Sequence, residues 1–243
     1  MRVIYEPSGK AREYSPLALN LYIGCSNGCN YCYVPRYCKL SKEEFRNNIS
    51  VRKNILRKLE LDSLQLKIEK NTKPILMCFT CDPYQEAEED HKITRQAIEI
   101  LNSYNQNFQI LTKNGNLATR DFELYKKKDT YAVTLTFDNE IHSRKFEPKA
   151  DIPQDRIKSL KKAHKLGIET WVSLEPVILT SQSLNLIDLT YEFVDLYKVG
   201  KLNGYPKTES RINWREFGKK AINKLKEYNK EFYIKKDLEK YLN

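Results

Sequence analysis

The sequence GCSNGCNYCYVPRYCKL, residues 24–40, contains four of the six cysteines of the 243-residue chain. Cys25, Cys29 and Cys32 follow one another with the spacing C-x3-C-x2-C. Gly24 and Gly28 can adopt the positive φ angles that a loop needs to wrap three thiolates around a small centre. Thiolates are ligands of zinc ions and of iron–sulfur clusters, and they also form disulfides. The loop is therefore a candidate for any of these three uses.

The rest of the chain favours a metal over a disulfide. The first residues, MRVIYEPSGKAREYS, lack the apolar segment of a signal peptide. No apolar run approaches the roughly 20 residues of a membrane-spanning helix. We therefore expect a cytoplasmic protein without a membrane segment. Thiols stay reduced in that compartment, and clustered cysteines there more often bind metal than pair with each other.

The chain carries a formal net charge of +10 and a sequence pI near 9.1. A basic protein of this kind suits a polyanionic partner, and nucleic acid is the commonest one. Abundant Lys, Asn, Ile and Tyr are also typical of proteins from AT-rich genomes. The charge is equally compatible with both explanations.

Short β-branched or apolar runs alternate with longer amphipathic segments along the chain. We expect strands at Leu17–Gly24, Pro74–Thr80, Phe108–Thr112, Tyr131–Phe137, Ile168–Val177 and Phe193–Val199. We expect helices at Ser41–Leu61, His91–Tyr104, Leu117–Lys127, Pro153–Leu166 and Gln182–Leu189, and a mostly helical segment at Asn213–Leu242. Ser41 and Glu44 have the spacing of a capping box. Gly167 stands where a helix commonly ends.

This alternation predicts right-handed βαβ units around a parallel sheet, the α/β class. Six units are too few for a closed eight-stranded barrel. The two remaining architectures are a partial (β/α)6 TIM-type barrel with helices outside, which we favour, and an open doubly wound sheet. We expect a single domain over residues 1–243, with the cysteine loop at 24–38 and a C-terminal helix at about 213–242. Functional residues of such folds lie at the carboxyl ends of the strands.

Two features weigh against a structural zinc ion, for which Cys38 would be the fourth ligand or Cys78 and Cys81 a second pair. Cys78 and Cys81 lie on a predicted strand, where residues three apart point to opposite faces. Cys38 lies beyond the compact group of three. Three thiolates would leave one iron of a 4Fe–4S cluster open, and a catalytic centre requires such an open position.

The segment CSNGCNYCY resembles the cluster loop of radical S-adenosylmethionine (SAM) enzymes, whose pattern is C-x3-C-x-aromatic-C with Tyr31 at the aromatic position. The segments FTCDPYQEAEE, ILTKNGNLATRD, VTLTFDNE and LGIETWVSLEPVI follow it. In order and spacing they are similar to the branch that includes spore photoproduct lyase. The resemblance covers roughly residues 17–205.

The resemblance implies two cofactors, a 4Fe–4S cluster and SAM. Cys25, Cys29 and Cys32 would bind three irons, and SAM would chelate the fourth. An electron from a reductant such as flavodoxin or ferredoxin would pass through the cluster to SAM. SAM would then split into methionine and a 5′-deoxyadenosyl radical, which abstracts hydrogen from a substrate.

The resemblance also assigns roles to residues at the strand ends. Tyr31 would lie near the adenine, Thr80 and Asp82 near the SAM amino group, and Lys113 near its carboxylate. Ribose and methionine contacts would come from Thr134, Thr136, Ser173 and Glu175, and Asn203 would contact the adenosine or the substrate. Structural alternatives exist for several of them: Asp82 followed by proline makes a turn, and threonines are ordinary strand residues.

Cys81 resembles the cysteine that returns a hydrogen atom to the product radical in spore photoproduct lyase, and Tyr33 is its candidate partner. The alternative is a buried thiol without chemistry. Arg144, Glu147 and Arg156 fall in a segment that is similar to a Glu-Pro…Arg stretch of the family. These residues either form an ion pair at the rim or contact the substrate.

The chain departs from spore photoproduct lyase after the sixth expected strand, where we expect only the one helix that ends it. This puts repair of thymine dimers in doubt. We therefore expect a radical SAM enzyme whose substrate is nucleic acid, in DNA repair or modification, with a peptide or a small metabolite as alternatives. The different-class alternative is a zinc-stabilised nucleic-acid-binding module, in which Cys25, Cys29, Cys32 and Cys38 form a structural site.

Overall fold

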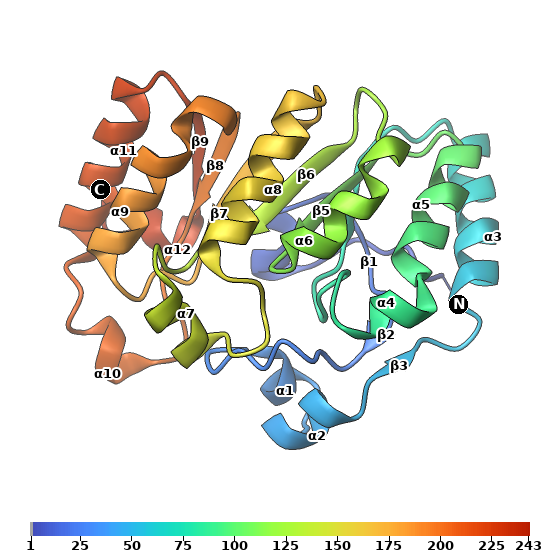
Figure 1. The fold of residues 1–243 in the computed structure, drawn as a ribbon, viewed down its shortest axis with the longest axis horizontal. Helices are drawn as coiled ribbons and strands as arrows, with labels where there is room; N and C mark the ends of the chain where they lie inside the picture. Colours follow the sequence, from blue (N-terminus) through green and yellow to red (C-terminus); the bar gives the residue numbers. More distant parts are fainter. Residues whose placement is uncertain (1) are drawn as a thin grey trace.

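Seven parallel strands form the central sheet of the computed structural model, which describes residues 2–243 (Figure 1). Their order is β1-β4-β5-β6-β7-β8-β9, so each strand lies beside its predecessor in the sheet. The strands are β1 Leu17–Leu19, β4 Ile75–Met77, β5 Phe108–Thr112, β6 Thr130–Thr134, β7 Glu169–Leu174, β8 Leu196–Val199 and β9 Glu231–Ile234. This unidirectional order confirms the expected partial barrel and excludes the doubly wound sheet, whose strand order reverses.

Helices cover one face of this sheet (Figure 1). The longer ones are α3 Ile55–Ile68, α5 Ile93–Ser103, α8 Pro153–Lys165, α9 Thr180–Thr190 and α11 Trp214–Glu227. Shorter helices and turns are η1 Gly9–Glu13, α1 Val34–Tyr37, α2 Lys42–Asn47, α4 Ala87–His91, α6 Gly115–Ala118, η2 Thr119–Leu124, α7 Glu140–Phe146, η3 Tyr191–Phe193, α10 Pro206–Glu209 and α12 Lys236–Glu239. Two residues of β2, Tyr22–Ile23, pair antiparallel with β3, Ser50–Val51.

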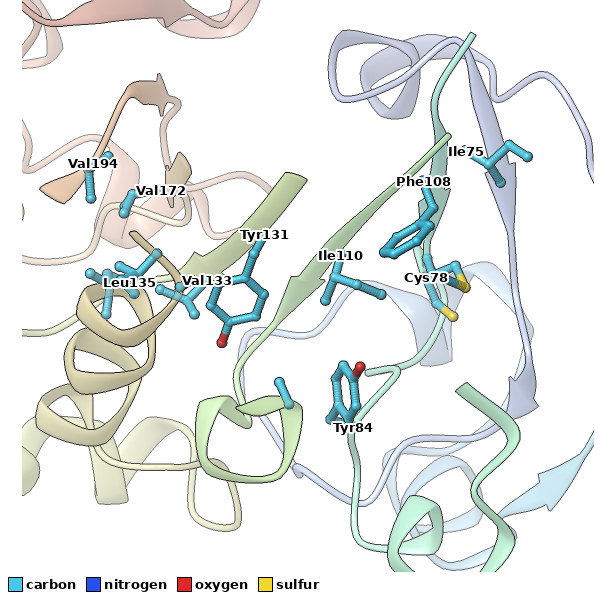
Figure 2. Packing of buried hydrophobic residues seen from close by; sticks show 14 of the residues in the cluster. Ile75, Cys78, Tyr84, Phe108, Ile110, Tyr131, Val133, Leu135, Val172 and Val194 are labelled. Carbon is cyan, nitrogen blue, oxygen red and sulfur yellow. The ribbon is translucent and has the colours of Figure 1, made fainter. Parts of the chain in front are cut away.

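The main core lies between the sheet and the helices. Figure 2 shows its side chains on successive strands, among them Phe108 and Ile110 of β5 and Tyr131 and Val133 of β6. A smaller cluster contains the alternate strand residues Leu76, Ala132 and Trp171. Because successive strand residues point to opposite faces, the two clusters mark the outer and inner faces of the barrel. The inner face leads to the carboxyl ends of the strands.

The segment Asn213–Leu242 is mostly helical as expected, but the expectation of one C-terminal helix at about 213–242 is wrong. Helix α11 ends at Glu227, and Asn229 turns the chain with a φ of 52°. Strand β9 then pairs in parallel with β8, with Tyr197 opposite Phe232. The short β-prone run Glu231–Ile234 is too short to show a clear period, and the exposed edge of β8 decides its conformation. The sheet therefore has a seventh strand where six were expected.

The prediction of a single helix over Ser41–Leu61 is also wrong. Its capping box is confirmed, since Ser41 Oγ accepts from the Glu44 amide at 3.1 Å. The chain leaves α2 at Asn47 to form β3 and re-enters a helix at Ile55. Pairing of β3 with β2 overrides the helical pattern.

Three further elements differ from expectation. The expected strand Leu17–Gly24 divides into β1 and β2. The expected helix Leu117–Lys127 is α6 followed by the 3-10 helix η2. Strand β4 ends at Met77, so residues 78–82 form a loop at the carboxyl end of the sheet. Within residues 2–243 no helix is both long and apolar enough to span a membrane.

Candidate functional site

The cysteine loop crosses the carboxyl end of the sheet between β2 and α1. Cys25, Cys29 and Cys32 are half-buried there, whereas Cys38 is exposed. Burial raises the pKa of the Cys25 thiol well above its usual range and that of Cys29 to about 12. Burial also raises the pKa of Cys32. The three thiols therefore share a desolvated site that Cys38 does not join.

Backbone contacts with α2 and α7 fix the path of this loop. Gly24 has a φ of 78°, and a Cβ added there would lie 2.7 Å from Asn48 O. The Cys25 amide donates to Phe45 O at 3.1 Å. The Asn30 amide donates to Phe146 O at 2.8 Å. Glycine is thus required at position 24 by both conformation and space.

The donor set suits a 4Fe–4S cluster. Such a cluster takes one thiolate on each of several irons, so its ligands surround a larger centre than a single ion. Three half-buried cysteines on one loop match that need.

Tyr31 of the cysteine loop joins a buried ion pair. Its hydroxyl donates to the Glu147 carboxylate and lies 3.2 Å from Thr136 Oγ1. Arg156 Nη2 donates to Glu147 Oε2 at 2.7 Å, and neither charged side chain is exposed. Burial opposes ionisation of Glu147, but the charges of Arg156 and Lys113 and the hydrogen bonds from Arg156 and Tyr31 together outweigh it and lower the pKa of Glu147. The Glu147–Arg156 ion pair at the rim is confirmed.

Arg144 does not join this pair. It lies 3.5 Å from Glu140 on its own helix and donates to Ala150 O at 3.0 Å. The ion-pair interpretation therefore applies to Glu147 and Arg156 only.

Lys113, at the end of β5, lies beside the cysteine loop. Its Nζ is 5.7 Å from the centroid of the Tyr31 ring. Its charge lowers the pKa of Cys29 and of Cys32 against the larger effect of burial. Lys113 therefore favours the thiolate forms that a metal needs.

Thr80, in the loop after β4, offers a free polar group. Its amide donates to Asn20 Oδ1 at 2.9 Å, but its Oγ1 is buried without a hydrogen-bond partner. A buried hydroxyl without a partner costs free energy. This hydroxyl fits a ligand that supplies the missing hydrogen bond.

Ser173 and Glu175 lie at the end of β7 and are bridged by a side chain that sequence reasoning missed. The Tyr14 hydroxyl donates to Glu175 Oε2 at 2.6 Å and lies 2.9 Å from Ser173 Oγ. Lys235 Nζ, just after β9, donates to the same Glu175 oxygen at 2.5 Å. Neither Tyr14 nor Lys235 belongs to a motif, so no local signal could have found them.

Thr134 and Asn203 lie at the same end of the sheet. Thr134 is buried beside Ser173 in the strand register, and its carbonyl accepts from Arg156 at 2.9 Å. Asn203 is half-buried after β8, and its Nδ2 donates to Lys201 O at 3.2 Å.

Cys81 and Tyr33 lie in different surroundings. Cys81 packs in the main core with Cys78, and both follow the end of β4, so the expectation that they lie on a strand is wrong. A hydrogen bond from Cys78 lowers the pKa of Cys81. Tyr33 is 60% exposed, and its hydroxyl donates to Phe79 O at 3.5 Å. Within residues 2–243 no hydrogen bond joins Tyr33 to Cys81.

The fold and the site together define a class of protein. It is a partial parallel barrel that carries a three-cysteine loop, the Lys113 side chain and the buried Thr80 hydroxyl without a partner at the carboxyl end of its sheet. The sequence model of the radical SAM superfamily matches residues 19–194, so the chain belongs to this superfamily. Enzymes of the superfamily use a 4Fe–4S cluster and SAM.

The chain is also similar in sequence to two uncharacterized proteins. An uncharacterized protein of Methanocaldococcus jannaschii is 30% identical over 176 residues, which are 71% of this chain and 62% of that protein. An uncharacterized protein of Acidianus two-tailed virus is 27% identical, over 71% of this chain and 60% of that protein. The chain thus spans about three fifths of the length of these two relatives.

Two kinds of solved structure share the fold. A spore photoproduct lyase variant with bound AdoMet and dinucleoside spore photoproduct has a TM-score of 0.73 at 12% identity, covering 94% of this chain and 78% of that one. A radical SAM methyltransferase from Sphaerobacter thermophilus has a TM-score of 0.61 at 12% identity, covering 90% and 65%. At such identities the likeness shows the fold alone.

Proposed function

We propose that this protein is a radical SAM enzyme that cleaves SAM reductively and abstracts hydrogen from a nucleic acid. The observation that carries the proposal is that three half-buried thiols, Lys113 and the Thr80 hydroxyl without a partner all lie at the carboxyl end of the sheet. The bound cofactors would supply the reducing electron and a 5′-deoxyadenosyl radical. The protein's part is to bind, orient and exclude water.

The rim residues divide this work. Cys25, Cys29 and Cys32 would hold three irons, and Lys113 would bind the SAM carboxylate through a charge-assisted hydrogen bond. Thr80 Oγ1 would meet the SAM amino group. The remaining candidates for contacts with SAM are Tyr31, Thr134, Thr136, Ser173, Glu175 and Asn203. Because Tyr31, Thr136 and Glu175 already have internal partners, they are held rigidly at the rim.

The nucleic-acid substrate is supported by charge and by exposed aromatic rings. The net charge is +10. Tyr33 and Tyr37, which follow Cys32 in the cysteine loop, are 60% and 76% exposed, and Arg36 between them is also exposed. Exposed aromatic rings next to cations suit stacking on unpaired bases. This combination favours a single-stranded or extruded base over a peptide or a small metabolite.

Two supporting roles belong to the same proposal. Cys81 would return a hydrogen atom to the product radical, with Tyr33 assisting. A flavodoxin or ferredoxin would supply the electron.

The cytoplasm, which keeps thiols reduced, suits this chemistry. We infer that the described chain acts as one domain around the seven-stranded sheet.

The test is anaerobic reconstitution with iron and sulfide, reduction with dithionite and an assay for 5′-deoxyadenosine after addition of SAM. We expect product from the wild type and from Cys38→Ala, and none from Cys29→Ala, because only Cys29 belongs to the buried group of three. A colourless protein that binds zinc and loses the zinc in Cys38→Ala would overturn the proposal in favour of the zinc-stabilised module.

A further inference from the structure

Five buried polar side chains connect the cysteine loop to the ends of β4 and β5. We call them the buried polar network: Asn27, Asp82, Gln85, Thr112 and Asn114, with exposed fractions of 3%, 8%, 0%, 2% and 7%. Buried polar groups are costly unless they are hydrogen-bonded, so the contacts within this network require an explanation.

Asp82 is the centre of the network. Its Oδ1 accepts from the Tyr84 amide at 2.9 Å and from Thr112 Oγ1 at 2.6 Å. Its Oδ2 accepts from the Lys113 amide at 2.7 Å and from Asn27 Nδ2 at 3.0 Å. A carboxylate has about four acceptor positions, and donors of this protein occupy that number. Asp82 therefore has no free acceptor position for a ligand.

The other members hold the cysteine loop on both sides of Cys25. Gln85 Oε1 accepts from the Ser26 amide at 2.9 Å, and Gln85 Nε2 donates to Gly24 O at 3.4 Å. Asn27 Oδ1 accepts from Asn114 Nδ2 at 2.9 Å. The backbone around one cluster ligand is thus tied to the two loops that carry Thr80 and Lys113.

We propose that the buried polar network is a positioning device that holds Cys25 and Lys113 at a fixed separation, and that Asp82 acts on the cofactors through these two residues instead of touching SAM. This inference rests on the proposed function, since it concerns how the cluster and SAM are placed relative to each other. Partners that orient metal ligands in this way contribute strongly to metal retention.

The test compares Asn27→Leu, Asp82→Asn and the exchanged double variant Asn27→Asp/Asp82→Asn. A matched control is Asn102→Leu, which changes a partly buried asparagine whose side chain bonds to Leu124 O, away from the cysteine loop. The readouts are iron loss to a chelator, the change that SAM causes in the electron paramagnetic resonance spectrum of the reduced cluster, and thermal unfolding. Thr112→Val removes only the two hydrogen bonds of the Thr112 hydroxyl, to Asp82 Oδ1 and from the Asn114 amide, and serves if another change prevents folding.

We expect each single variant to lose iron about 10- to 100-fold faster than the wild type, with a weakened spectral response to SAM. The double variant should recover part of both losses, because the exchanged amide can again donate to the exchanged carboxylate. Wild-type iron retention and spectra in both single variants would overturn the inference, as would a double variant no better than Asp82→Asn. A wild type that holds no cluster would refute the proposed function instead.

Discussion

Arg156 is the largest side chain that the described part of the protein buries completely. Its guanidinium donates to Glu147, to Asp151 O at 2.9 Å and to Thr134 O at 2.9 Å. A single residue thereby ties β6, α8 and the Glu147 carboxylate that holds Tyr31. The contacts of Arg156 reach β6 and the segment between α7 and α8, which no sequence spacing reveals.

Replacement of Arg156 by methionine should lower the free energy of unfolding by about 3–5 kcal/mol, because Glu147 would remain charged and buried without its partner. Urea denaturation monitored by circular dichroism measures this loss. The control is Lys158→Met on the same helix, which breaks an exposed pair with Asp155 and should cost at most about 1 kcal/mol. Equal losses in the two variants would contradict the assignment of Arg156.

Lys198, on the inner face of β8, makes the free energy of unfolding depend on pH. Burial and the neighbouring Lys235 charge lower its pKa to about 8, with Glu13 opposing weakly. The unfolded chain keeps this proton to about pH 10. Between these values the unfolded state binds more protons, so this group makes stability rise with pH.

The expected outcome is that wild type gains about 1–3 kcal/mol relative to Lys198→Met between pH 7 and pH 10. Denaturation curves at three pH values measure the difference, in which the other titrating groups cancel. The variant also loses the contacts of Lys198 to Tyr14 O at 2.8 Å and to the Trp171 ring at 4.7 Å, so the change of the difference with pH is the quantity that reports the titration. A difference independent of pH would show that Lys198 is not desolvated.

At the scale of elements, two glycines with nearly the same conformation separate backbone strain from site geometry. Gly24 and Gly167 have φ angles of 78° and 76°. A Cβ at Gly24 would meet Asn48 O and Phe45 O within 2.8 Å, whereas a Cβ at Gly167 would meet nothing within 4 Å. Gly24→Ala should therefore abolish cluster assembly, while Gly167→Ala should cost about 1–2 kcal/mol and leave the cluster intact.

Iron content after reconstitution and thermal unfolding of both variants measure these effects. Full iron content in Gly24→Ala would show that the cysteine loop does not need its packing against residues 45–48.

The strands were easier to predict than the helices. Runs such as Phe108–Thr112 are bounded by polar residues and buried on both faces, so their pattern is local. The prediction of one helix over Ser41–Leu61 was wrong because pairing between β2 and β3 interrupts the helical pattern. Strand β9 was not predicted because its conformation depends on the open edge of β8, which is distant in sequence.

At the scale of the whole molecule, the net charge of +10 predicts salt-dependent binding of single-stranded nucleic acid. The affinity for a mixed-sequence oligonucleotide should fall about tenfold or more between 50 and 200 mM salt, because bound phosphates release counterions. Fluorescence anisotropy measures this. Tyr37→Ala should weaken binding by about 1–3 kcal/mol through lost stacking.

The matched control is Lys226→Ala, an exposed lysine on α11, which should leave the affinity unchanged. Absence of binding at 50 mM salt would contradict a nucleic-acid substrate and leave the peptide or small metabolite. That outcome would not affect the cleavage of SAM, which is measured separately.

The sequence by itself determined the superfamily, through the resemblance of its cysteine loop and strand-end motifs, and the parallel barrel, through strand periodicity. It also predicted Cys25, Cys29 and Cys32 as the cluster ligands. The tertiary structure alone decided which polar residues are free and which are occupied. Asp82 and Thr80 lie two residues apart, yet Asp82 has four internal donors and Thr80 Oγ1 has no partner. The reason is physical: hydrogen-bond saturation depends on groups that several separate loops bring together, and no local pattern encodes their meeting.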